Sequence, residues 1–128
     1  MDLVLYHYAG CSTCRKARRF LEQNGFSSTL IDLKQSPPSV SVVADLHGVS
    51  GVPVKKFFNT SGQSYRGGGW KDRLPGMQDA AAYEALSADG MLIKRPILSV
   101  TRADGTRAVT VGFKEAAWSS LLGIGSSE

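Results

Sequence analysis

Two cysteines, Cys11 and Cys14, are the side chains in this sequence best suited to chemistry, and Ser12 and Thr13 separate them. A Cys-X-X-Cys pair is typical of a dithiol in which one sulfur attacks a disulfide and the other resolves the product. The pair follows an apolar run and precedes a segment with helical periodicity, so we expect it where a helix begins. The unpaired N–H groups and the positive end of the dipole at that position stabilise a thiolate. The sequence therefore predicts a nucleophile at Cys11 and a resolving thiol at Cys14.

Two other interpretations of the cysteine pair remain open from the sequence: a structural pair without chemistry, and two ligands of a zinc ion. A structural zinc site needs four ligands. The other candidate ligands are His7 and His47, and their spacing matches no common zinc motif. We therefore expect no bound metal and no bound cofactor. The expected electron donor is glutathione, or a thioredoxin or glutaredoxin.

Arg95 and Pro96 stand between two predicted strands of the second half of the chain. A proline that enters a strand cannot donate to the ladder, and it often marks a particular turn or a cis bond. In a thioredoxin-type fold this loop faces the active cysteine. Arg95 is then able to hold an oxyanion or to lower the thiol pKa through its charge. The alternative is a surface arginine that precedes an edge proline.

Several polar residues are further candidates for the surroundings of the thiolate. His7 either tunes the thiolate or is a core histidine with satisfied hydrogen bonds. Asn59 and Thr60 either line an anion pocket or only form a turn. Arg15 opens the basic run 15–19, which we interpret mainly as a solvated helix face and not as a nucleic-acid site. The full set of candidate neighbours is His7, Ser12, Thr13, Arg15, Asn59, Thr60 and Pro96.

The order of the predicted elements indicates an α/β protein with a thioredoxin-like fold. A strand, a helix and a strand at the start of the chain form a βαβ unit, whose two strands should be parallel. A helical stretch follows, and the last third returns to strands and ends in a helix. We expect strands at 2–8, 28–33, 91–93, 97–100 and 107–111, and helices at 13–23, from Pro37 to about Gly51, at 79–88 and at 115–122.

These elements give one domain with a mixed four-stranded sheet and an inserted helical subdomain between the βαβ and ββα halves. Residues 1–35 and 91–122 should form the thioredoxin-like core, and residues 36–90 the helical insertion. The Gly- and Ser-rich residues 123–128 should form a flexible tail.

The composition is that of one ordinary globular domain and sets limits on function. The chain has 128 residues, of which 42% are hydrophobic and 20% charged, and its net charge is +4. It has no apolar run long enough for a membrane span and no basic region of a signal peptide at its start. Two cysteines provide no disulfide framework for a secreted fold. We therefore expect a cytoplasmic monomer that binds neither membranes nor nucleic acid directly.

The chain resembles the ArsC-type arsenate reductases and their relatives, the Spx-type regulators and the YffB-type thiol proteins. The resemblance implies a thioredoxin-like sheet with an inserted helical subdomain, a cis proline at Pro96, and an attacking thiolate at Cys11 with His7 nearby. It rests on five segments: Tyr6-His7, Cys11-Ser12-Thr13-Cys14-Arg15-Lys16-Ala17, Phe58-Asn59-Thr60-Ser61-Gly62, Asp89-Gly90-Met91-Leu92-Ile93-Lys94-Arg95-Pro96-Ile97 and Val111-Gly112-Phe113.

The chain also departs from the pattern of the arsenate reductases that couple to glutathione and glutaredoxin. Those proteins carry one cysteine in the loop and three arginines around the oxyanion. This chain adds Cys14, and only Arg95 matches an arginine, while Asn59 and Gly112 stand in place of the other two. Each lost charge-assisted contact is worth about 1.5–3 kcal/mol. The departure favours thiol exchange over tight oxyanion capture.

The leading prediction is a thiol-disulfide oxidoreductase in which Cys11 attacks a disulfide, a glutathione adduct or an oxyanion and Cys14 resolves the adduct. Glutathione or thioredoxin would regenerate the dithiol. One form of this prediction is an arsenate reductase-like enzyme that is coupled to glutathione or thioredoxin. The alternative is an Spx-like redox-sensing regulator. Its disulfide state would alter a surface that binds the C-terminal domain of the RNA polymerase alpha subunit.

Overall fold

A mixed four-stranded sheet forms the centre of the protein in the computed structural model, which describes residues 1–124. The strand order is β2-β1-β3-β4. β1 pairs in parallel with β2 and antiparallel with β3, and β3 pairs antiparallel with β4. The predicted α/β class and the mixed sheet are therefore confirmed. The strands are β1 (Asp2–His7), β2 (Thr29–Asp32), β3 (Ile97–Thr101) and β4 (Arg107–Val111).

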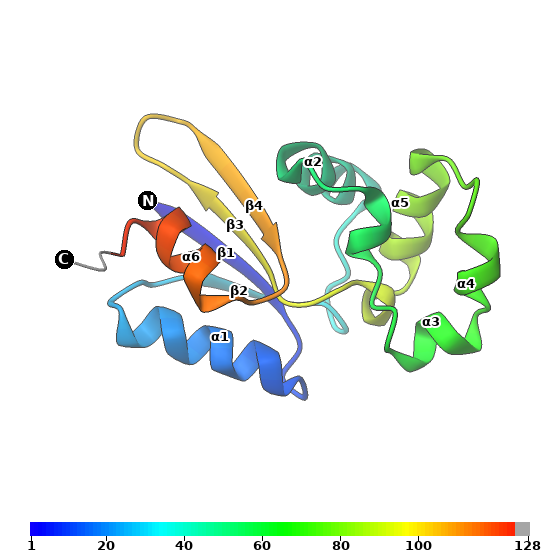
Figure 1. Ribbon diagram of the computed structural model, residues 1–128, viewed down its shortest axis with the longest axis horizontal. Coiled ribbons are helices and arrows are strands. Elements are labelled where there is room, and N and C mark those ends of the chain that lie inside the picture. Colours follow the sequence, from blue (N-terminus) through cyan, green and yellow to red (C-terminus); the bar gives the residue numbers. More distant parts are fainter. Residues whose placement is uncertain (125–128) are drawn as a thin grey trace.

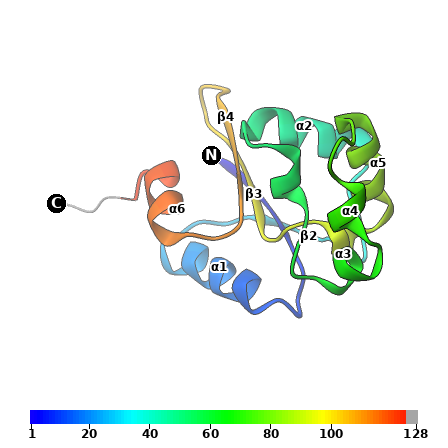
Figure 2. The same ribbon diagram turned by 45° about the vertical axis from the view of Figure 1, so that its right-hand side comes forward.

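Helices cover both faces of the sheet (Figure 1). The two views agree that α1 and α6 lie on one side and α2 to α5 on the other (Figure 2). The helices are α1 (Ser12–Gln23), α2 (Val40–Ser50), α3 (Gln63–Gly67), α4 (Trp70–Arg73), α5 (Asp79–Ala88) and α6 (Glu115–Leu122), with short 3-10 helices η1 (Val54–Phe57) and η2 (Gly90–Leu92). Within residues 1–124, no helix has both the length and the apolar character that a membrane span requires.

The face of the sheet that carries α1 is built from alternate residues of the strands, because successive side chains of a strand point to opposite faces. Leu3 and Leu5 of β1 lie on this face, where they pack with Leu21 of α1 and Trp118 of α6. Full burial of each such side chain contributes about 1.5–3 kcal/mol. This packing fixes α1, and with it the position of both cysteines, against the end of β1.

The opposite face packs against the helical segment between β2 and β3. Tyr6 of β1 and Ile97 of β3 share one core with Leu46 of α2, Phe57 of η1 and Leu86 of α5. A bidentate ion pair also joins α2 to the outer strand β4. In it, Nη1 and Nη2 of Arg107 donate to the two carboxylate oxygens of Asp45, at 2.9 and 2.7 Å. The helical segment is thus held to the sheet by apolar packing and by one surface contact.

The prediction of a strand at 91–93 is wrong, because η2 occupies Gly90–Leu92. Asp89 caps this turn, since its carboxylate accepts from the backbone N–H of Met91 at 3.0 Å. Gly90 lies directly against the Leu33 backbone, where a Cβ would come within 1.7 Å of the carbonyl oxygen. η2 packs with α5 and α3, so residues 91 and 92 lie with the helices and not with the sheet.

Two further expectations differ from the structure in detail. The helix expected from Pro37 begins at Val40, because Ser39 is its N-cap and accepts from the Val42 N–H at 3.3 Å. Of the expected tail at 123–128, Ile124 still donates its N–H to Ser119 at 2.8 Å, and residues 125–128 lie outside the described part.

Candidate active site

Cys11 is the N-cap of α1, in the position that the sequence predicts. Its backbone is extended, with φ −94° and ψ 117°, and its Sγ accepts a hydrogen bond from the backbone N–H of Cys14 at 3.3 Å. The Cys11 N–H in turn donates to the carbonyl of Tyr8 at 3.0 Å, which closes the loop after β1. Both cysteines are free thiols, Cys11 half-buried and Cys14 fully buried. A cap sulfur at a helix N-terminus is a good position for negative charge.

The two thiols have pKa values shifted in opposite directions. Partial burial raises the pKa of Cys11, but hydrogen bonding from Cys14 and the nearby Arg95 guanidinium outweigh it, so the pKa lies below the ordinary value of 9.0. Burial raises the pKa of Cys14, and the hydrogen bond to Cys11 and the charge on Cys11 add to it, so that it reaches about 12. Cys11 is therefore the thiol of the pair that ionises more readily, and Cys14 is the one that ionises less readily.

Arg95 approaches the thiolate from the loop before β3. Its Nη1 donates to the carbonyl of Met91 at 3.4 Å, and its guanidinium lies 5.3 Å from the centre of the Tyr8 ring. The Arg95–Pro96 peptide bond is cis, as the family resemblance implies. The Pro96 carbonyl accepts from the N–H of Gly112 at 2.8 Å. The structure thus brings together the cysteine loop, the proline loop and the segment that follows β4.

A groove of about 480 Å³ opens beside these three segments. Gly112, which lines the groove, has φ 84°, a backbone conformation that L side chains rarely adopt. Four of its residues are basic, and three of these, Lys56, Lys94 and Lys114, are not among the sites predicted from the sequence. The groove is lined by Thr13, Val52, Pro53, Lys56, Lys94, Arg95, Val111, Gly112, Phe113 and Lys114.

His7 lies at the end of β1, on the face of the sheet that α1 covers. It is buried, and its Nδ1 has no hydrogen-bond partner within the described residues, so the alternative of a fully satisfied core histidine does not hold at this atom. Burial lowers the pKa of His7, the charge of Arg18 lowers it further, and Asp32 opposes both. The charged groups that influence His7 are therefore Arg18 and Asp32, and Cys11 is not one of them.

Asn59 takes part in a turn and is absent from the residues that line the groove. Its N–H donates to the Leu92 carbonyl at 2.8 Å, and its carbonyl accepts from Gly62 at 3.0 Å. Its Oδ1 accepts from the Ser61 hydroxyl at 3.3 Å. Thr60, at the tip of this turn, is exposed. These contacts correspond to the alternative in which the segment is only a turn.

Arg15 and Ser12 are both exposed at the start of α1. Nη1 of Arg15 donates to the carbonyl of Ala9 at 3.0 Å, so this side chain braces the loop that carries Cys11. Thr13 is the residue of this turn that reaches the groove. Of the predicted neighbours of Cys11, the structure therefore places Thr13, Arg95 and the proline loop together.

Sequence reasoning missed the three groove lysines, although a local signal was present for two of them. Lys94 directly precedes Arg95, and Lys114 follows two residues after Gly112, so both flank residues that the resemblance singles out. Lys56 reaches the groove from η1, which is distant in the sequence, and only the packing of η1 beside the proline loop places it there. This packing includes the Lys94 N–H, which donates to the Phe57 carbonyl at 2.7 Å.

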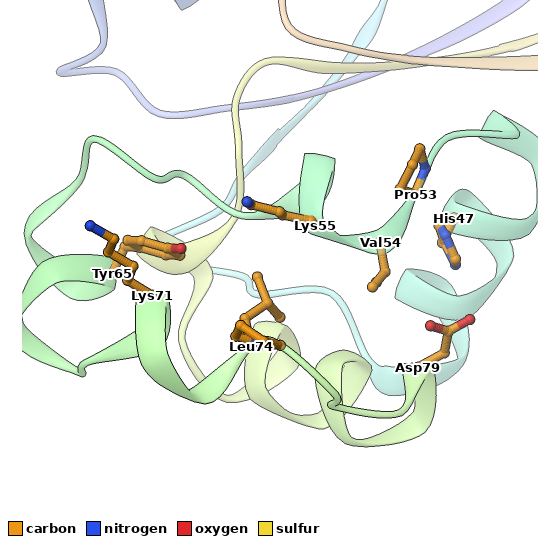
Figure 3. Close-up of a pocket in the computed structure, with 9 residues that line it drawn as sticks. His47, Pro53, Val54, Lys55, Tyr65, Lys71, Leu74 and Asp79 are labelled. Atoms are coloured by element: carbon orange, nitrogen blue, oxygen red, sulfur yellow. The ribbon is translucent and has the colours of Figure 1, made fainter.

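A second cavity, of about 550 Å³, lies within the helical segment and is distinct from the groove beside Cys11. Figure 3 shows His47 and Asp79 at one end and Tyr65 and Lys71 at the other. Nε2 of His47 is 2.8 Å from the Val52 carbonyl, which can only accept, so Nε2 carries the proton. In the neutral imidazole, Nδ1 then accepts from the Tyr83 hydroxyl at 2.6 Å. His47 therefore joins α2 to α5 and to the segment before η1.

A zinc site was the other chemical interpretation of the two cysteines. Within residues 1–124, no group of three or more His, Cys, Asp and Glu side chains is arranged to hold a metal ion. Within this part of the chain, Cys11 and Cys14 are accompanied by fewer such side chains than the four ligands of a tetrahedral zinc site.

A thioredoxin-like sheet, a cysteine that caps the first helix and a cis proline before β3 together define the general class of thioredoxin-like thiol proteins. Comparison with known families is more specific. The model of the ArsC family matches residues 6–121, and this chain belongs to that family.

Relatives and solved structures agree with this assignment. The chain is 45% identical over 115 residues to the uncharacterised protein YusI of Bacillus subtilis, a match that covers 90% of this chain and 93% of YusI. It is 42% identical to a possible arsenate reductase from Streptococcus mutans, with a TM-score of 0.76 and coverage of 88% and 91% of the two chains. An ArsC-family-related protein from Bacteroides fragilis is 36% identical, with a TM-score of 0.85 and coverage of 94% and 98%.

Proposed function

We propose that this protein is a thiol-disulfide oxidoreductase with Cys11 as nucleophile and Cys14 as resolving thiol. The Cys11 thiolate attacks one sulfur of a disulfide, forms a mixed disulfide with it and releases the other half as a thiolate. Cys14, as its thiolate, then attacks Cys11, which forms the Cys11–Cys14 disulfide and releases the second half. Two electrons from glutathione or a thioredoxin or glutaredoxin in the cytoplasm return the pair to the dithiol.

The observation that carries this proposal is the contrast between two thiols one helical turn apart. Cys11 is partly exposed and has a lowered pKa, whereas Cys14 is fully buried and has a raised one. An attacking thiol must be ionised and accessible, and a resolving thiol must be shielded from outside reactants. Arg95 stabilises the charge on Cys11 and on the thiolate that leaves.

A disulfide suits the site better than an arsenate-like oxyanion. Gly112 has no side chain to offer, and the Asn59 side chain is engaged with Ser61 in a turn. Arg95 is left as the one matching guanidinium of the three that the resemblance implies. Release of arsenite from arsenate by the wild-type protein with glutathione and glutaredoxin, if lost in Cys11→Ser and retained in Cys14→Ser, would contradict this preference.

The alkylation rate of Cys11 as a function of pH tests the proposal. We expect Cys14→Ser to react with iodoacetamide along a single titration curve whose midpoint lies below 9.0, because the Cys11 thiolate is stabilised. Cys11→Ser should react far more slowly at every pH up to about 9, since Cys14 is fully buried and burial is the largest cause of its raised pKa. Equal rates for the two variants, or a midpoint at the value of a free thiol, would rule out the proposal.

A second candidate function rests on the exposed basic face of α1, where Arg15, Lys16 and Arg19 are all accessible beside the cysteine loop. In this alternative the Cys11–Cys14 disulfide changes a surface that binds a protein, as in an Spx-like regulator. A pull-down with the C-terminal domain of the RNA polymerase alpha subunit, with the reduced and the oxidised protein, distinguishes the two. Binding in neither state would eliminate this candidate.

A further inference from the structure

The charged residues that line the groove near Cys11 are all basic. Lys56 enters it from η1, Lys94 and Arg95 from the proline loop, and Lys114 from the segment before α6. No residue that lines it is acidic. Four cations from three separate segments therefore face a volume of about 480 Å³. Such a concave surface with charge of one sign raises the local concentration of anions.

The three lysines of the groove are also free to bind a ligand. Among residues 1–124, the structure contains one ion pair, between Arg107 and Asp45. No carboxylate of these residues therefore lies at contact distance from the groove lysines. Lys56 and Lys114 are exposed, and Lys94 is half-buried. Their ammonium groups remain available because no carboxylate within residues 1–124 forms an ion pair with them.

Cys11 is not among the residues that line the groove, but two lining residues, Arg95 and Thr13, relate the groove to the reactive sulfur. Arg95, which lines the groove, is also the residue whose guanidinium lowers the pKa of Cys11. Thr13, from the first turn of α1, lies between the cap cysteine and Cys14 in the sequence and also lines the groove. A ligand in the groove that contacts Arg95 would therefore be near the residue that acts on the Cys11 sulfur.

We propose that this groove selects the substrate of Cys11, and that the substrate is a small disulfide that carries carboxylate groups. The inference rests on the proposed thiol exchange and adds to it the chemical class of the disulfide. The carboxylates lie among Lys56, Lys94 and Lys114, and one sulfur of the disulfide lies against Cys11. The volume suits a molecule of peptide fragment size, and the apolar residues Val52, Pro53 and Phe113 contact its carbon chain.

The reaction needs no further reagent in its first step. The Cys11 thiolate forms a bond to one substrate sulfur, the substrate S–S bond breaks, and the other half leaves as a thiolate that takes up a proton from water. Arg95 faces the sulfur on which this negative charge develops. The lysines act before this step, because they bind and orient the substrate but do not exchange protons or electrons with it.

Three symmetrical disulfides of similar size and different charge test the inference. We would measure the second-order rate constant of reduced Cys14→Ser with the dianion 3,3′-dithiodipropionate, the neutral bis(2-hydroxyethyl) disulfide and the dication cystamine at low ionic strength. Each constant is divided by that of dithiothreitol with the same disulfide, which removes the intrinsic reactivity of the disulfide. We expect the dianion to be favoured over the neutral compound by about tenfold and the dication to be disfavoured, with both effects reduced by salt.

Paired charge variants locate the effect. In the Cys14→Ser background, Lys56→Gln with Lys114→Gln should remove most of the preference for the dianion. Lys55→Gln with Lys71→Gln changes the net charge equally, but these exposed lysines line the cavity of the helical segment instead, so the preference should persist. Both pairs are exposed, so neither should affect folding.

The outcomes separate this inference from the proposed function. Rapid reaction with all three disulfides at equal normalised rates would overturn the inference and leave thiol exchange intact. A preference that both lysine pairs reduce equally would also overturn it, since the effect would then reflect net charge and not the groove. Reaction with none of the three would overturn thiol exchange and the inference together.

Discussion

Cys11 and Cys14 occupy neighbouring positions of one helix turn, yet their surroundings favour opposite charge states. The difference arises from direction, because the cap sulfur of Cys11 faces the helix N–H groups and Arg95, whereas the Cys14 side chain enters the core beneath α1. The order of reactivity therefore follows from where each side chain points and not from the Cys-X-X-Cys spacing alone. The sequence predicts that Cys11 attacks, and its partial exposure and lowered pKa support that prediction.

Replacing Arg95 tests the electrostatic part of this description. Arg95→Gln should raise the pKa of Cys11 towards 9.0, because it removes a cation that favours the thiolate. The alkylation rate should then fall at neutral pH, where less thiolate is present, and stay unchanged well above the pKa, where Cys11 is ionised in both proteins. Arg19→Gln is the matched control, since Arg19 is an exposed arginine of the same helix and is not among the causes of the Cys11 pKa shift. An identical shift in both variants would mean that net charge alone sets the pKa.

At the scale of elements, α1 and η2 illustrate what sequence patterns can and cannot predict. α1 was predicted to within one residue, because its apolar spacing, its Asn24-Gly25 end and the preceding strand all agree. η2 was predicted as a strand, because Met91-Leu92-Ile93 is apolar and carries no period of its own. The determining contacts are tertiary, namely Gly90 against Leu33 and the Asp89 cap.

The contact of Gly90 with Leu33 gives a prediction for stability. Gly90→Ala should destabilise the protein by about 2–4 kcal/mol, because the added Cβ would lie 1.7 Å from the Leu33 carbonyl oxygen and the backbone would have to move. Gly48→Ala is the control, since nothing lies within 4 Å of its Cβ position within α2, and alanine should stabilise a helix by up to about 1 kcal/mol. Urea unfolding measures both, and a neutral Gly90→Ala would show that η2 packs differently.

At the scale of the whole molecule, the helical segment does not have a core separate from the sheet, because it shares the core on one face of the sheet. Tyr6 and Ile97 of the sheet pack in the same cluster as Leu46, Phe57 and Leu86. The division of the chain into core and insertion therefore describes its sequence order more than its packing. The sequence predicted α1, α2, α5 and α6 but not the short helices α3 and α4. It also could not show that both sides of the division bury their apolar faces against each other.

A shared core predicts a single cooperative unfolding transition. Trp70 lies in the helical segment and Trp118 in α6, on opposite sides of the sheet, so each tryptophan reports on one part. Trp118→Phe keeps only Trp70, and Trp70→Phe keeps only Trp118. In each variant, we expect unfolding by urea followed by fluorescence to coincide with unfolding followed by far-ultraviolet circular dichroism. A Trp70 signal that changes at lower urea than circular dichroism would show that the helical segment unfolds by itself.

The buried position of Cys14 also has a consequence for the timing of the two exchange steps. With a pKa of about 12, on the order of one Cys14 thiol in 10⁵ is ionised at pH 7. Two of the causes of that pKa are the hydrogen bond to Cys11 and the charge on Cys11, and both disappear once Cys11 is capped by a mixed disulfide. In the proposed reaction, formation of the mixed disulfide would therefore lower the pKa of Cys14, although burial, the largest cause of its raised pKa, would remain. The surroundings of the two thiols would in this way favour attack by Cys14 only after Cys11 has reacted.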